Sequence, residues 1–137
     1  MKKTYLSVFV ICGLLFSTLL SCNFVNEQVT DPRTVCEEVF EVVEEMPELI
    51  GGLAGLHSRL EYPEESEQRG VEGRVTVEFV VNKIGTTNDL KIIRGVDIET
   101  NKEALRLVKT SIFDPGRMNG EETCVQMQLP VLFKLQN

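Results

Sequence analysis

The sequence predicts an α+β fold, in which an antiparallel β-sheet and two helices packed on one face form two layers. Two observations predict it. Residues 74–82 and 125–135 alternate apolar and polar side chains with a period of two, which is typical of half-buried strands. Residues 53–60 and 104–112 instead repeat leucine, valine and isoleucine at helical spacing. The predicted order is strand, helix, strand, strand, helix, strand.

Residues 1–21 are interpreted as a secretory signal. Lys2 and Lys3 precede an apolar run from position 6 to 20, which is shorter than the roughly 20 residues of a membrane-spanning helix. The run ends in Leu-Leu-Ser before Cys22, which resembles a bacterial lipobox and implies a lipid on the Cys22 sulfur. Acyl chains such as palmitate hold a protein stably on a bilayer when two or more are attached. A plain signal peptide and an uncleaved anchor helix are the alternatives.

Residues 22–38 then form the lipidated cysteine and a short polar tether, and residues 39–137 form one domain. Loss of Lys2 and Lys3 with the signal changes the net charge from −7 to −9. A nucleic-acid partner is therefore not expected, because such binding neutralises phosphates with Lys and Arg.

The first half of the domain begins with strand-forming residues 39–43. A helix over 53–60 places Leu53, Leu56 and Leu60 on one face. Tyr62-Pro63 interrupts it, because a residue before proline avoids the α region. Residues 64–69 suit a short helical turn that ends at Gly70.

The second half begins with a hairpin of strands 74–82 and 89–94, with Gly85 in the turn. Thr100 and Glu103 have the spacing of a capping box that opens a helix. The core side chains expected from this helix are Ala104, Leu105, Val108 and Ile112. The last strand, 125–135, has an apolar residue at every odd position.

Two cysteines, Cys36 and Cys124, remain in the exported domain. They precede the first and last predicted strands, in a compartment that permits disulfides. A bridge between them is one interpretation, and two separate buried thiols are the alternative. Their spacing does not favour zinc binding or thiol redox chemistry.

The order of several short motifs resembles the TonB C-terminal domain family. The motifs are Gly51-Gly52, Tyr62-Pro63, Gly73-Arg74-Val75, Glu103-Ala104-Leu105-Arg106, Phe113-Asp114-Pro115-Gly116, Gly120 and the closing Leu129-Pro130-Val131-Leu132-Phe133. The resemblance implies a periplasmic domain that binds an extended segment of an outer-membrane TonB-dependent receptor as a strand beside its own last strand. The implied partner-binding residues are Val125, Gln126, Met127, Gln128, Leu129, Val131, Leu132 and Phe133.

Pro130 independently suggests that the last strand has an unpaired side, because proline is tolerated in sheets essentially at edges or bulges. The edge would then either bind a partner or merely be protected against aggregation. Two differences from the family argue against an energy-transducing role for this chain. The family has an inner-membrane helix that contacts a proton-driven motor and a long Pro-rich spacer, whereas a lipid on Cys22 and a short tether replace them here.

Enzymatic activity is not expected, and neither is a cofactor or metal. His57, the only histidine, is interpreted as a surface or core-edge residue, so no His-Cys metal cluster or Ser-His-Asp set is present. The predicted function is that of a lipid-anchored periplasmic TonB-like binding module. A structural or adaptor lipoprotein with another envelope partner is the alternative. Whether the anchor lies in the inner or the outer membrane stays open.

Overall fold

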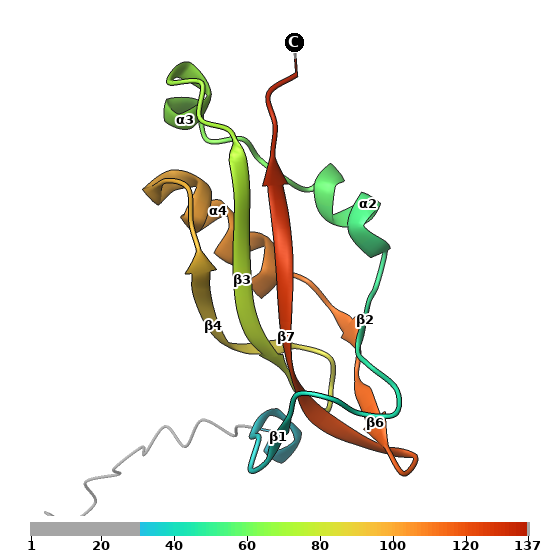
Figure 1. The fold of residues 1–137 in the computed structure, drawn as a ribbon. Helices are drawn as coiled ribbons and strands as arrows, with labels where there is room; N and C mark the ends of the chain where they lie inside the picture. Colours follow the sequence, from blue (N-terminus) through green and yellow to red (C-terminus); the bar gives the residue numbers. More distant parts are fainter. Residues whose placement is uncertain (1–30, 137) are drawn as a thin grey trace, which may run out of the picture.

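The computed structural model describes residues 31–136, which form a twisted sheet with helices against one face (Figure 1). The strand order is β1 (Val39–Phe40), β7 (Glu121–Phe133), β3 (Gly73–Val81) and β4 (Thr87–Arg94). β3 pairs antiparallel with β4 and with β7, whereas β1 pairs parallel with β7. The predicted α+β class is confirmed, with β1 as one parallel addition to an otherwise antiparallel sheet.

Three very short strands complete the fold. β6 (Gly116–Met118) forms a hairpin with the start of β7, through Asn119 and Gly120. β2 (Glu48–Leu49) and β5 (Phe113–Asp114) form a separate two-stranded sheet. These strands could not be predicted from the sequence, because two or three residues are too few to show a period of two.

The helices are α2 (Gly52–Ser58), α3 (Glu64–Gln68) and α4 (Ile98–Lys109), preceded by the short 3-10 helix η1 (Pro32–Thr34). The described residues thus contain three α-helices rather than the two expected, because the helical turn predicted at 64–69 forms a separate helix. Leu56 of α2 and Leu107 of α4 belong to one core cluster with Val77 of β3. α2 and α4 therefore cover the same face of the sheet.

The core consists of alternate residues of β3 and β7 together with the inward sides of the helices. Its fully buried members include Val75, Val77, Phe79, Val81, Val131 and Phe133. Two residues predicted to belong to the core are instead exposed: Leu53 at 54% and Ile112 at 49%. Ile112 follows the end of α4, where the extended chain buries Ser111 and Phe113 on either side of it and directs Ile112 outward.

The N-cap of helix α4 lies three residues before Thr100, the predicted N-cap. Asp97 is the N-cap: its carboxylate accepts a hydrogen bond from the Thr100 amide at 2.8 Å, and the Thr100 hydroxyl accepts one from the Asp97 amide at 3.2 Å. The predicted box of Thr100 and Glu103 is therefore wrong. Glu103 is buried instead, and it accepts hydrogen bonds from the Glu61 amide at 2.9 Å and from Arg106.

The Asp97 carboxylate also accepts hydrogen bonds from the Ser66 hydroxyl at 2.8 Å and from Arg69 Nη2 at 2.5 Å, both on or beside α3. The hydrogen bond from the Thr100 side chain is the largest influence that lowers the pKa of Asp97, to about 2, with Ser66 and Arg69 adding to it. One carboxylate thus ties α3 to the start of α4.

The segment before β1 is attached to the domain. Cys36 and Cys124 form a disulfide, and the Asn88 side-chain amide donates to the Thr34 carbonyl at 2.8 Å. The expected signal at 1–21 and Cys22 lie outside the described residues. Over residues 31–136, no helix has the length and hydrophobicity needed to cross a membrane.

Candidate functional site

One side of β7 is unpaired over most of its length. Val125 has strand neighbours on both sides, because Phe40 of β1 pairs with it opposite β3, and Glu121–Thr123 pair with β6. From Gln126 to Phe133, β3 is its only strand neighbour among the residues that the structure describes. We call Gln126–Phe133 the open edge. In Figure 1, β7 runs alongside β3 on one flank, while β1 and β6 lie only near its lower end.

Pro130 lies within this open edge and pairs in register with Thr76 of β3 without interrupting the ladder. In an antiparallel ladder, successive residues direct their backbone groups alternately toward the two sides of a strand. Because proline has no N–H, Pro130 fits a position whose backbone groups face away from β3. Gln126, Gln128 and Leu132 share its parity, so their N–H and C=O groups face the open side as well.

The predicted partner-binding residues divide into three groups. Val125 lies beyond the open edge, because Phe40 of β1 already pairs with it. Gln126, Gln128 and Leu132 point to the outer face of the sheet, where Leu132 is 46% exposed. The others point to the face that the helices cover: Met127 and Leu129 are half-buried, and Val131 and Phe133 are buried. A strand added here would therefore meet two glutamines and the exposed Leu132 on one face, and half-buried or buried apolar side chains on the other.

A shallow hollow of about 320 Å³ lies over the outer face at the start of the open edge. It is lined by Glu41, Glu78, Gln126, Met127 and Gln128. Gln128 Nε2 donates to Glu78 Oε2 at 3.1 Å across the β3–β7 pair. Glu41 immediately follows β1, at the point where that strand leaves β7. These two glutamates were not predicted as site residues, although the alternation of β3 already placed Glu78 on its polar face.

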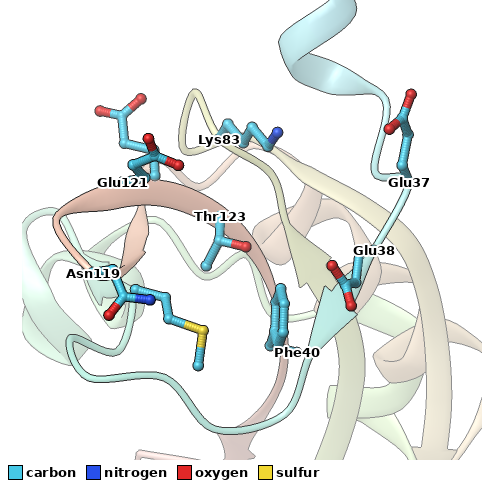
Figure 2. Close-up of a pocket in the computed structure, with 9 residues that line it drawn as sticks. Glu37, Glu38, Phe40, Lys83, Asn119, Glu121 and Thr123 are labelled. Atoms are coloured by element: carbon cyan, nitrogen blue, oxygen red, sulfur yellow. The ribbon is translucent and has the colours of Figure 1, made fainter.

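A second hollow, of about 300 Å³, lies at the end of β7 that pairs with β6 (Figure 2). The ring of Phe40 and the Thr123 side chain lie on its floor, and Lys83, Glu38 and Glu121 lie around it. It is separate from the open edge, since Glu121 and Thr123 belong to the part of β7 that β6 covers.

The described residues show no group of three or more His, Cys, Asp or Glu side chains placed to hold a metal ion. His57 is exposed on α2, where its Nδ1 lies 2.8 Å from the Leu53 carbonyl oxygen. The arrangement at β7 offers main-chain hydrogen bonds and side-chain surfaces, which are the means by which an extended peptide is recognised at a sheet edge.

The fold is that of a small α+β domain in which the open edge of β7, as well as the outer side of β4, has no strand neighbour among the described residues. Residues 58–135 match the family described as Gram-negative bacterial TonB protein C-terminal, and the chain belongs to this family. The expected resemblance is thereby confirmed.

Protein TonB of Helicobacter pylori, strain ATCC 700392 / 26695, is 30% identical over 84 residues, which cover 59% of this chain and 28% of that protein. Protein TonB of Helicobacter pylori strain J99 is 29% identical with the same coverage. The chain thus spans under a third of the length of these relatives.

Solved structures with similar coordinates include two TonB C-terminal domains studied by NMR. That of Helicobacter pylori shares 26% identity with a TM-score of 0.49, over 62% of this chain and 78% of that one. That of Pseudomonas aeruginosa shares 25% identity with a TM-score of 0.47, over 58% and 84% respectively.

Proposed function

We propose that this domain is a periplasmic TonB-like binding module that recognises an extended segment of an outer-membrane receptor by strand addition in TonB-dependent transport. The observation that carries the proposal is the open edge, Gln126–Phe133, in a member of the TonB C-terminal family. Free N–H and C=O groups along such an edge supply affinity to an incoming strand, and flanking side chains supply selectivity. Binding, rather than catalysis, is the activity that this geometry supports.

Titration of the isotope-labelled full-length chain, held in detergent micelles, tests the proposal. The titrant is a peptide copied from the amino end of a receptor encoded beside this gene. We expect the backbone amides of Gln126–Phe133 to shift in the NMR spectrum, with the largest changes at the even positions that face the open side. Shifts confined to other elements, or none at all, would count against strand addition.

We further propose that Cys22 carries a lipid that anchors the domain to a bacterial membrane. The lipobox-like Leu19-Leu20-Ser21-Cys22 supports it. A lipid enters one leaflet only, so this anchor offers no membrane-spanning helix to a motor complex. Cys22→Ser is expected to release the protein from the membrane fraction. Retention of the variant in that fraction would rule out the lipid as the anchor.

The second candidate is a structural or adaptor lipoprotein that uses the same edge for another envelope protein. The short polar stretch 23–34 after Cys22 favours it, because about a dozen residues extend only roughly 40 Å. A photo-crosslinker at Gln128, on the outer face of the open edge, separates the two candidates in living cells. Receptor adducts support the first candidate, and adducts with other envelope proteins support the second.

A further inference from the structure

Over its first half, residues 126–129, the open edge has two chemically different faces. On the helix-covered face, Met127 and Leu129 pack against the core cluster while remaining half-buried. Side chains of an added strand alternate between the faces, so residues opposite Met127 and Leu129 are directed toward this apolar surface. The residue between them is directed outward, beside Gln126 and Gln128.

The outward-facing residue of the added strand would lie near two carboxylates. Glu41 and Glu78 both line the hollow that spans Gln126 and Gln128. Glu41 lies on the side of β7 from which a strand would arrive, because it follows β1 directly and β1 pairs with the open side of β7 at Val125. Glu78 reaches toward the edge through its hydrogen bond from Gln128.

These two carboxylates are not neutralised by an ion pair. Among residues 31–136, no Lys, Arg or His nitrogen lies within 4.0 Å of the carboxylate of Glu41 or Glu78. Lys91, the register partner of Glu78, belongs to β4 and lies on the far side of β3 from the open edge. A cation brought by a partner strand would therefore meet negative charge, whereas an acidic side chain would be repelled.

We infer that the strand added at the open edge carries a Lys or Arg at its outward position beside Gln126 and Gln128, flanked by apolar residues that face Met127 and Leu129. This inference rests on the proposed strand addition and specifies the chemistry of the partner segment. Its sequence pattern is apolar, basic, apolar. β1 fixes where the pattern begins, because it occupies the edge up to Val125.

Three capped pentapeptides test the pattern, each with the sequence Thr-Val-X-Val-Thr, where X is lysine, glutamate or the uncharged norleucine. Each is titrated into the labelled full-length chain in detergent, and Kd is taken from the amide shifts of Gln126–Phe133. We expect the lysine peptide to bind about tenfold more tightly than the glutamate peptide at low ionic strength, with norleucine between them. The ratio should fall as salt is added.

The variant that tests the carboxylates combines Glu41→Gln and Glu78→Gln, and it should bring the ratio of the two Kd values close to one. The matched control combines Glu37→Gln and Glu121→Gln, which removes the same charge from the hollow of Figure 2 and should leave the ratio unchanged. A ratio that drops equally in both variants would show only a general effect of net charge and would overturn the inference.

The outcomes distinguish this inference from the proposed function. Equal Kd values for all three peptides, with shifts at Gln126–Phe133, would support strand addition but overturn the basic preference. No shifts at those amides with any peptide would count against strand addition itself. Shifts that grow with protein concentration in the absence of peptide would show that a second copy of the chain occupies the edge, and the inference would be wrong.

Discussion

Pro130 lies opposite Thr76 in an unbroken antiparallel ladder between β7 and β3. A proline within a ladder of nine paired residues keeps its place because the position needs no N–H on the side of β3. The same residue leaves a gap in the row of donors along the open edge. It thus permits the fold and at the same time limits what can pair with the other side of the strand.

Pro130→Thr should restore a donor to the open edge with little effect on the fold. We expect the free energy of unfolding to change by less than about 1 kcal/mol, because no bond to β3 is gained. Strand peptides should bind more tightly, and dimers should form more readily, as measured by analytical ultracentrifugation. Leu132→Thr, which adds the same side chain but no backbone N–H, is the control. A stabilised monomer with unchanged peptide affinity would show that the new N–H faces β3.

Removal of the disulfide should destabilise the domain substantially. The bridge between Cys36 and Cys124 closes a loop with a sequence separation of 88. In the chain-entropy description, such a loop contributes about 4 to 5 kcal/mol. The double variant Cys36→Ser and Cys124→Ser should therefore lose close to this amount in urea denaturation, and β1 should show faster amide exchange. Unchanged stability would mean that the segment before β1 is already confined in the unfolded chain.

Asp97 should contribute a pH-dependent part of the stability. Its pKa in the folded protein is lowered from 3.8 to about 2, so its contribution is fully present above pH 4 or so and is lost as the pH falls through about 2. Asp97→Asn keeps a good N-cap but removes the charge. We expect the variant to be about 1 to 2 kcal/mol less stable near pH 6 and to match the parent near pH 2.

Urea denaturation across that pH range measures the difference. Glu99→Gln, in the same first turn of α4, is the matched control, because Glu99 pairs only with the exposed Lys102. Its effect should be small at every pH. A constant difference between the parent and Asp97→Asn would contradict the lowered pKa.

Gly85 should tolerate no side chain. It has φ of +83°, and a Cβ there would lie 1.9 Å from the Phe113 carbonyl oxygen. The Gly85 carbonyl also accepts a hydrogen bond from the Phe113 amide at 2.9 Å, which joins the β3–β4 turn to β5. We expect Gly85→Ala to cost at least about 2 kcal/mol in thermal or urea unfolding.

Gly120→Ala, in the turn between β6 and β7, is the comparison for Gly85→Ala. Gly120 has φ of +79°, but nothing lies within 4 Å of a Cβ built there. That variant should cost only the penalty of a left-handed backbone, about 1 kcal/mol. Equal losses in the two variants would mean that the contact with Phe113 relaxes without cost.

The long elements could be predicted from the sequence because each repeats its pattern several times. Four valine or phenylalanine residues at odd positions define β3, and five apolar residues at odd positions define β7 from Val125 to Phe133. The pairing of Cys36 with Cys124 was one of two alternatives. What decides it is the parallel contact of β1 with β7, which brings Val39 opposite Cys124. No local pattern encodes that contact.

The candidate site could be predicted in outline but not in extent. Pro130 indicated an unpaired side, yet the limit of the edge at Val125 depends on a parallel strand of two residues. Similarly, Asp97 became the N-cap of α4 because Ser66 and Arg69, distant in sequence, also bind its carboxylate. Tertiary contacts of this kind select between local signals of similar strength.

The position of the disulfide determines how the domain responds to mechanical load. A pull at Asp31, the first described residue, is transmitted through Cys36 directly to Cys124 of β7, the strand that carries the open edge. The force therefore reaches β7 through covalent bonds without passing through the helices. A strand bound along Gln126–Phe133 and pulled along its own length would be loaded in shear, so that its hydrogen bonds resist together rather than one after another.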